Sequence, residues 1–121
     1  MPQTSQQLSG KQYEELACKY LCKQGLKLLT RNYHCRRGEI DLIMRDKESL
    51  VFVEVRYRRQ SRYGSASESV NWQKQQRLIA AAEHYLLHEF KTQPAARFDV
   101  IAINGIKDAI ELEWIHNAFG T

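Results

Sequence analysis

Residues 38–58 read GEIDLIMRDKESLVFVEVRYR, and this stretch decides the fold. Two runs rich in β-branched and other apolar residues, 39–45 and 50–57, flank a polar turn at 46–48, which predicts an antiparallel hairpin. Charged residues nevertheless interrupt both apolar runs, at Glu39, Asp41, Glu54 and Arg56. A strand that lies in the centre of a sheet is expected to be more apolar than this, so the charges require a functional or structural explanation.

Side chains alternate between the two faces of a strand. The pattern therefore predicts that the four charged side chains gather on one face of the hairpin and that their apolar neighbours occupy the other: Ile40, Leu42, Val53 and Val55. Slipping the register by one residue would turn the charges into the core, so the apolar pattern fixes the pairing.

Three carboxylates on one face, at Glu39, Asp41 and Glu54, favour a metal site. Carboxylates this close raise one another's pKa unless a cation lies between them. Mg²⁺, or Mn²⁺ in its place, is held by one or two carboxylates together with water and substrate phosphate. Such a site positions a water molecule for attack on phosphorus. The alternative is an ion-pair network on the solvent face of an antiparallel sheet.

The charge balance favours an anionic partner. The chain has 121 residues, a length typical of one domain spanning 1–121, with 18 Lys and Arg against 14 Asp and Glu. Seven arginines flank the acidic cluster, at Arg31, Arg36, Arg37, Arg56, Arg58, Arg59 and Arg62. Such a basic rim suits nucleic acid, although charge runs are also typical of solvated faces. The candidate nucleic-acid contacts are Arg36, Arg37, Arg58, Arg59, Arg62 and Lys74.

The beginning of the chain and its cysteines predict a cytoplasmic protein that does not enter a membrane. Residues 1–10 contain no apolar signal segment, and no run reaches 18 apolar residues. Cys18, Cys22 and Cys35 are odd in number and are predicted to be free, buried thiols. A zinc site that adds His34 to them is the alternative, but its spacing fits no common zinc pattern.

The remaining elements complete an α/β domain. Helices are predicted over 9–24 and 70–90, and further strands over 26–33, 97–103 and 109–115. Ser9 and Gln12 form a capping box, and Gly25 ends the first helix. The second helix is expected to face inward with Leu78, Ala81, Ala82, Tyr85 and Leu86. The order α-β-β-β-α-β-β predicts a mixed central sheet flanked by helices.

The motif Asp41, a turn, then Glu54-Val55-Arg56 resembles the core of the restriction-endonuclease-like nuclease superfamily, written PD-(D/E)XK. GEIDLI, VFVEV, a helical Lys and RFDV, together with Glu-x-x-Ala on the first helix, resemble in particular the YraN-like family of small bacterial proteins. The resemblance covers nearly the whole chain. It implies a restriction-endonuclease-like core similar in layout to archaeal Holliday-junction resolvases.

The resemblance also implies roles for single residues. Asp41 and Glu54 match the metal ligands, and Glu14 matches a helix-borne acid that serves as a further ligand or orients water. Glu39 lies inside the family motif with its role open. The implied activity is Mg²⁺-dependent phosphodiester hydrolysis on structured or branched DNA, and a homodimer would give two sites suited to such a substrate.

The departure from the motif is Arg56, which stands where the superfamily has Lys. Arginine stays protonated and is a poor general base, although its fork can stabilise charge on a phosphate. Lys74 offers an ammonium group from the second helix, but Lys74 and Arg77 are also typical of an ordinary exposed helix turn. Two functions therefore stay open: a metal-dependent endonuclease, or a catalytically inactive nucleic-acid-binding or partner-docking domain with a nuclease fold.

Overall fold

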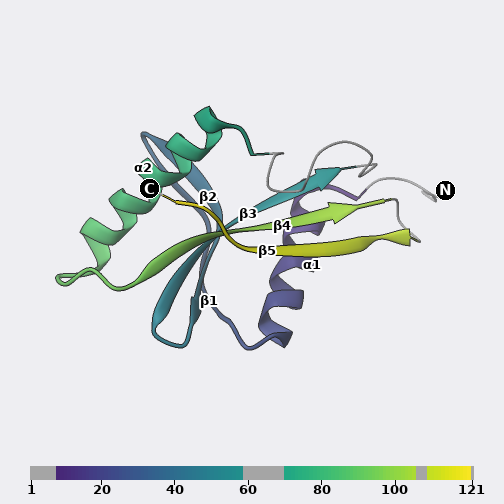
Figure 1. Cartoon of the computed structure of the whole chain (residues 1–121), viewed down its shortest axis with the longest axis horizontal. Helices are drawn as coiled ribbons and strands as arrows, with labels where there is room; N and C mark the ends of the chain where they lie inside the picture. Colours follow the sequence, from purple (N-terminus) through teal and green to yellow (C-terminus); the bar gives the residue numbers. More distant parts are fainter. Residues whose placement is uncertain (1–7, 59–69, 106–108, 121) are drawn as a thin grey trace.

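The structure, a computed structural model, describes residues 8–58, 70–105 and 109–120. Its elements are α1 (Gly10–Lys23), β1 (Lys27–Cys35), β2 (Gly38–Asp46), β3 (Ser49–Arg58), α2 (Trp72–Glu89), β4 (Ala96–Asn104) and β5 (Glu111–Phe119). The strands form one sheet in the order β1-β2-β3-β4-β5. β3 and β4 are parallel and the other neighbours antiparallel. This confirms the predicted mixed α/β layout and element order (Figure 1).

Both helices begin at side-chain caps that the sequence contains. Ser9 and Gln12 form the predicted capping box of α1, and Gly25 follows the helix at φ 103°. The second helix starts later than predicted, because Asn71 is its N-cap and accepts a hydrogen bond from the Lys74 backbone N–H at 2.8 Å. Val70, placed in the helix by the sequence pattern, instead packs in the core just before it.

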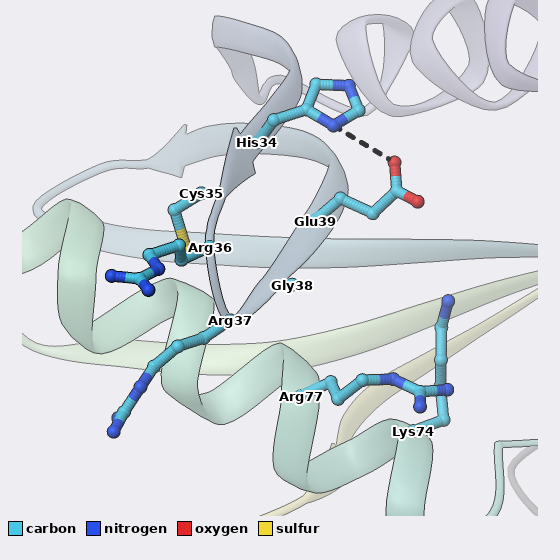
Figure 2. A pocket seen from close by; sticks show the side chains of 8 residues that line it. All are labelled: His34, Cys35, Arg36, Arg37, Gly38, Glu39, Lys74 and Arg77. Atoms are coloured by element: carbon cyan, nitrogen blue, oxygen red, sulfur yellow. Dashed lines mark ion pairs between the residues drawn. The ribbon is translucent and has the colours of Figure 1, made fainter.

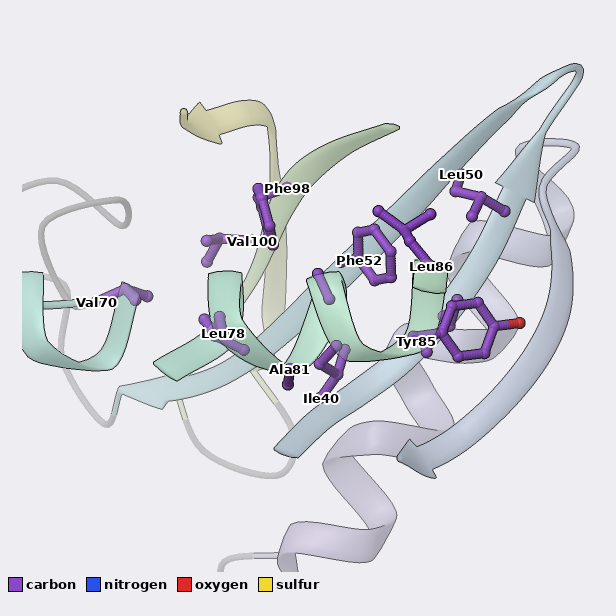
Figure 3. Packing of buried hydrophobic residues seen from close by; sticks show 12 residues of the cluster. Ile40, Leu50, Phe52, Val70, Leu78, Ala81, Tyr85, Leu86, Phe98 and Val100 are labelled. Atoms are coloured by element: carbon purple, nitrogen blue, oxygen red, sulfur yellow. The ribbon is translucent and has the colours of Figure 1, made fainter. Parts of the chain in front are cut away.

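The helices cover opposite faces of the sheet, and each closes its own apolar core. Against α2 lie Ile40, Ile43, Leu50, Phe52, Phe98 and Val100, packed on the predicted inward face of that helix (Figure 3). Against α1 lie Leu42, Met44, Val51, Val53, Ile101 and Ile103. The sheet is therefore apolar on both sides, and a charged side chain in β2 or β3 must lie where this covering ends.

The predicted alternation of faces fails at Asp41. Ile40 packs in the core under α2, whereas Leu42 packs in the core under α1, although alternation assigns both to one face. β1 and β2 keep one register through Arg31–Leu42 and Tyr33–Ile40, but the intervening Asn32 and Asp41 are not paired, and Asn32 has φ 51°. The change of face at Asp41 therefore coincides with a left-handed residue in the neighbouring edge strand.

The cysteines correct a second expectation. All three are free, but only Cys18 is buried, while Cys35 is half-buried and Cys22 is exposed. Cys22 lies in the last turn of α1, where Leu21 takes the buried position. In the described ranges, no helix is long and apolar enough to cross a membrane. The cytoplasmic location and the homodimer stay predictions.

Candidate functional site

Two acidic side chains meet where β2 and β3 separate. The paired register of these strands ends at Leu42–Val53, one step before Asp41 and Glu54. Figure 1 shows the two strands diverging beyond this point. Instead of continuing the ladder, the Asp41 carboxylate accepts a hydrogen bond from the Val55 backbone N–H at 2.8 Å. The Asp41 side chain is thereby held across the opening of the sheet, beside Glu54.

Burial sets the electrostatics of this acid pair. Only 4% of Glu54 is exposed, and burial, followed by the nearby Asp41 carboxylate, raises the pKa of Glu54 from 4.5 to about 7. Burial also raises the pKa of Asp41, although the hydrogen bond from Val55 opposes this. The two neighbouring carboxyl groups affect each other in the sense that favours the proton on Glu54. Near neutral pH Glu54 is therefore partly protonated, and a bound cation can replace this proton.

Two cations approach Glu54 from different elements. Lys74 Nζ of α2 lies 3.5 Å from Glu54 Oε2, and Arg56 Nη1 of β3 lies 3.7 Å from the same oxygen. Both cations lower the pKa of Glu54 against the effect of burial. Arg77 is exposed, as expected for an ordinary surface turn of a helix. Lys74 is only partly exposed: 28% of its side chain is accessible, and its ammonium group contacts Glu54. The interpretation of Lys74 as an exposed surface residue was wrong.

Arg56 retains an unsatisfied donor. Its Nε atom is buried and has no hydrogen-bond partner among the residues described. A buried guanidinium donor without an acceptor carries a desolvation cost. Arg56 thus keeps an unused donor beside Glu54, and this donor is shielded from the surface.

Glu14 joins the site from the other side of the sheet. Its pKa is raised by burial first and then by the Asp41 carboxylate, whereas the nearby Asn32 side chain lowers it. The sequence left open whether Glu14 points inward or outward; in the structure it lies beside Asp41. Asn32 was missed by the sequence analysis. Its one signal is that asparagine tolerates the left-handed conformation it adopts here.

Glu39 lies at the rim. Its side chain is 57% exposed and pairs with His34, with Oε1 3.3 Å from Nδ1. Its charge still reaches far enough to raise the pKa of Asp41. In the described part of the chain, no three His, Cys, Asp or Glu side chains form a group that could hold a metal by themselves. The predicted set of Asp41, Glu54 and Glu39 is therefore a close pair with a more distant third acid.

Asp99, the second buried acid besides Glu54 in the described residues, shows the contrast with a purely structural role. Asp99 is fully buried and accepts hydrogen bonds from Arg97 Nε at 3.1 Å, Trp114 Nε1 at 2.9 Å and the Asn117 backbone N–H at 2.8 Å. Its oxygens are satisfied by donors from two strands, β4 and β5. Asp99 therefore stabilises the β4–β5 edge and stands apart from the acid pair.

A basic pocket of about 390 Å³ opens beside the acid pair (Figure 2). We use this name for the hollow between the β1–β2 turn and α2, which is lined by His34, Cys35, Arg36, Arg37, Gly38, Glu39, Lys74 and Arg77. Lys74 belongs to both places, since it lines the pocket and contacts Glu54. Lys74 is therefore the residue through which the pocket and the acid pair adjoin.

The other predicted contacts lie elsewhere. Arg58 is half-buried, and its Nε donates to Asn104 Oδ1 at 3.0 Å, so the structure does not bring it into the pocket. Arg59 and Arg62 lie outside the described residues. Of the six predicted basic residues, Arg36, Arg37 and Lys74 line the pocket.

The fold and site define an α/β protein with a buried acid pair at the opening of a mixed sheet, next to a basic pocket. The chain belongs to the uncharacterised protein family UPF0102, whose family model matches residues 13–103. The YraN-like resemblance is confirmed at the level of this family.

Relatives match over almost the full chain. A UPF0102 protein of Nitrosococcus oceani is 56% identical over 111 residues, which are 91% of this chain and 90% of the relative. One from Herminiimonas arsenicoxydans is 51% identical, covering 97% and 90% of the two chains. One from Pseudomonas savastanoi pv. phaseolicola is 47% identical and covers 98% of each. The site lies inside the matched region, since Glu14, Asp41, Glu54 and Lys74 all fall within 13–103.

Proposed function

We propose that this protein is a Mg²⁺-dependent nuclease of the restriction-endonuclease-like superfamily that hydrolyses phosphodiester bonds in structured or branched DNA. The observation that carries the proposal is the contact of Lys74 with Glu54, at 3.5 Å, beside Asp41. It joins a carboxylate pair, an ammonium group and a basic pocket in one site. Metal-assisted hydrolysis of a phosphodiester uses groups of these kinds to hold the ion, stabilise developing charge and bind the substrate.

The acid pair fits a Mg²⁺ or Mn²⁺ ion. Mg²⁺ is usually bound through one or two carboxylates, with water and substrate phosphate as the remaining ligands. Asp41 and Glu54 would supply the carboxylates, and Glu14 and Glu39 lie near enough to affect the same charge. When bound, the ion would supply Lewis-acid polarisation of the phosphate and a more acidic water. The proton retained by the pair near neutral pH is expected to leave when the ion binds.

The neighbouring residues would orient the reacting groups. The Lys74 ammonium, held against Glu54, is placed to orient a water or to neutralise charge on phosphate oxygens. Arg56, whose Nη1 lies 3.7 Å from Glu54 and whose side chain is 38% exposed, would donate to a phosphate oxygen. Glu14, which lies near Asp41, would accept a hydrogen bond from water on the α1 side. Lys74 thereby takes the role that the superfamily motif assigns to the Lys at position 56.

A non-catalytic DNA-binding or partner-docking domain is the second candidate function. The residue that favours it is Arg56, because an arginine cannot act as the base that a lysine can become. Arg56→Lys separates the two functions when the wild type cleaves slowly. A gain of cleavage identifies a weakened enzyme, whereas binding without cleavage by either protein supports the binding domain.

The test is a cleavage assay with a matched pair of variants. Single-stranded, duplex, flapped and four-way-branched DNA, and the corresponding RNA, are incubated with Mg²⁺ or Mn²⁺. We expect cleavage of DNA by wild type that stops in EDTA and in Glu54→Gln, and that persists in Glu48→Gln, which removes an exposed acid from the β2–β3 turn. Binding without cleavage would move the assignment to the second candidate, and absence of both would overturn both.

A further inference from the structure

The basic pocket contains more positive charge than the protein itself neutralises. Arg36, Arg37 and Arg77 line it together with Lys74, and within the described ranges none of the three arginines forms an ion pair. The acid that lines the same pocket, Glu39, is paired with His34. Arg97 of β4, by contrast, is matched with both Asp46 and Asp99. The pocket therefore offers an anion from outside the described chain a concentration of unneutralised positive charge.

The pocket is built by a close contact that fixes the turn on the helix. A Cβ atom added to Gly38 would lie 2.7 Å from the Arg77 carbonyl oxygen, closer than real Cβ contacts allow. The backbone of the turn therefore lies directly against α2. This contact sets the spacing between the arginines of the turn and those of the helix.

The positive groups are spread along the site. In Figure 2 the Arg77 side chain extends along α2 toward Lys74, whereas Arg36 and Arg37 extend from the turn in the opposite direction. A single small anion is bound best by donors that converge on one point. Donors arranged along a line are typical of proteins that follow a nucleic-acid backbone.

We propose that the basic pocket holds the backbone of one nucleic-acid strand, with successive phosphates contacted first by Arg36 and Arg37 of the turn and then by Arg77 of α2. The strand continues past Lys74 to the acid pair, where the next phosphate lies. This inference rests on the proposed function for the identity of the ligand, but it requires neither metal nor hydrolysis. The inference adds Arg77 to the binding residues. It also makes the basic pocket the part of the site that determines the direction in which the nucleic-acid strand runs.

The test measures binding of fluorescently labelled single-stranded DNA of about 16 nucleotides by anisotropy, in EDTA, over a series of salt concentrations. The variants are Arg36→Gln and Arg77→Gln. The control is Lys47→Gln, which removes the same charge from the β2–β3 turn, away from the pocket. Thermal melting of each variant verifies that it is folded.

We expect each pocket variant to weaken binding about 3- to 10-fold and to lower the slope of log K against log salt by about 0.7, the value for one phosphate contact on a single strand. Lys47→Gln should leave the slope unchanged. Pocket variants that match Lys47→Gln would overturn the inference. Because EDTA removes the metal, this outcome is independent of whether the acid pair catalyses hydrolysis.

A competition experiment distinguishes a pocket that binds a nucleic-acid strand from a pocket that binds a single phosphate. Inorganic phosphate and a mononucleotide are expected to displace the labelled strand poorly, whereas an unlabelled oligonucleotide at equal total phosphate displaces it fully. Full displacement by inorganic phosphate would show a site for one small anion and overturn the strand assignment. Oligonucleotides with and without a 5′-phosphate should bind equally, because the contacts are to internal phosphates.

Discussion

The ammonium group of Lys74 lies 3.5 Å from Oε2 of Glu54, although Lys74 belongs to the covering helix α2 and Glu54 to the central strand β3. The contact is built by the Asn71 cap, which starts α2 where its first turn faces the opening between β2 and β3. The contact brings a positive charge from the helical layer next to a buried acid of the sheet. The proposed chemistry depends on this contact.

Removing Lys74 should raise the pKa of Glu54. That pKa is about 7, and Lys74 is one of the two cations that lower it. In Lys74→Met we expect a higher value, and in Lys74→Arg a value close to wild type, measured by carbon-13 NMR titration of the Glu54 carboxyl group. Arg77→Met is the matched control, because Arg77 is exposed and makes no ion pair with Glu54 in the described chain. An unchanged pKa in Lys74→Met would show that the contact is absent in solution.

Glu54→Gln should stabilise the metal-free protein above neutral pH. Burial raises the pKa of Glu54 from 4.5 in the unfolded chain to about 7, so the folded state holds the proton more tightly. The stability from this proton is fully present below pH 4.5 and is lost as the pH rises through 7. At pH 8 the charged, buried Glu54 should therefore cost on the order of 1–3 kcal/mol.

Urea unfolding at pH 5 and pH 8 measures this difference. The advantage of Glu54→Gln over wild type should be larger at pH 8 and shrink at pH 5. Glu39→Gln, which changes an exposed acid, should alter the free energy of unfolding by less than about 0.5 kcal/mol at either pH. A Glu54→Gln protein equally destabilised at both pH values would contradict the account.

Gly38→Ala should disturb the basic pocket through the backbone. The added methyl group would meet the Arg77 carbonyl oxygen at 2.7 Å, so the turn and α2 must move apart. We expect a loss of about 1–3 kcal/mol in the free energy of unfolding. Gly10→Ala is the control, since nothing lies within 4 Å of a Cβ added there. Chemical denaturation of both variants tests the difference, and equal stability would mean that the turn does not press on the helix.

We expect that a lysine at position 56 can partly replace the ammonium group of Lys74 in the proposed reaction. Lys74→Met should lower kcat/KM by roughly 100-fold, the lower range for a positioned proton-transfer or charge-stabilising group. Adding Arg56→Lys in that background should restore part of the rate, because residue 56 approaches the same oxygen of Glu54. Steady-state cleavage of branched DNA measures both effects. No recovery in the double variant would show that only the geometry of α2 supports the reaction.

Local sequence signals predicted most of the fold. The caps at Ser9 and Gly25 and the inward face of α2 follow from residue type and a 3.6-residue period, and the structure confirms them. The face of Asp41 could not be read from alternation. The change of face coincides with the left-handed Asn32 in the neighbouring strand, and a relationship between two strands is not contained in the pattern of either one.

The composition of the site was predicted less evenly. Asp41 and Glu54 follow from their motif, and the structure brings them together. Lys74 and Glu14 remained ambiguous because each lies on a helix whose rotation is set by packing against the sheet. Glu39 was grouped with the acids by spacing alone, but its partner is His34 on the adjacent strand. Contacts between a helix and the sheet, or between neighbouring strands, cannot be read from residue spacing along the sequence.

The most direct test of the central claim is calorimetric titration of Mg²⁺ and Mn²⁺ into wild type, Asp41→Asn and Glu48→Gln. Asparagine keeps an oxygen that can accept the hydrogen bond from Val55 while it removes the charge, so the variant separates metal binding from folding. The account predicts binding with proton release near pH 7 in wild type and Glu48→Gln, and its loss in Asp41→Asn. No binding by folded wild type in the presence of DNA, or equal binding by Asp41→Asn, would contradict it and leave the acid pair a structural feature of the sheet.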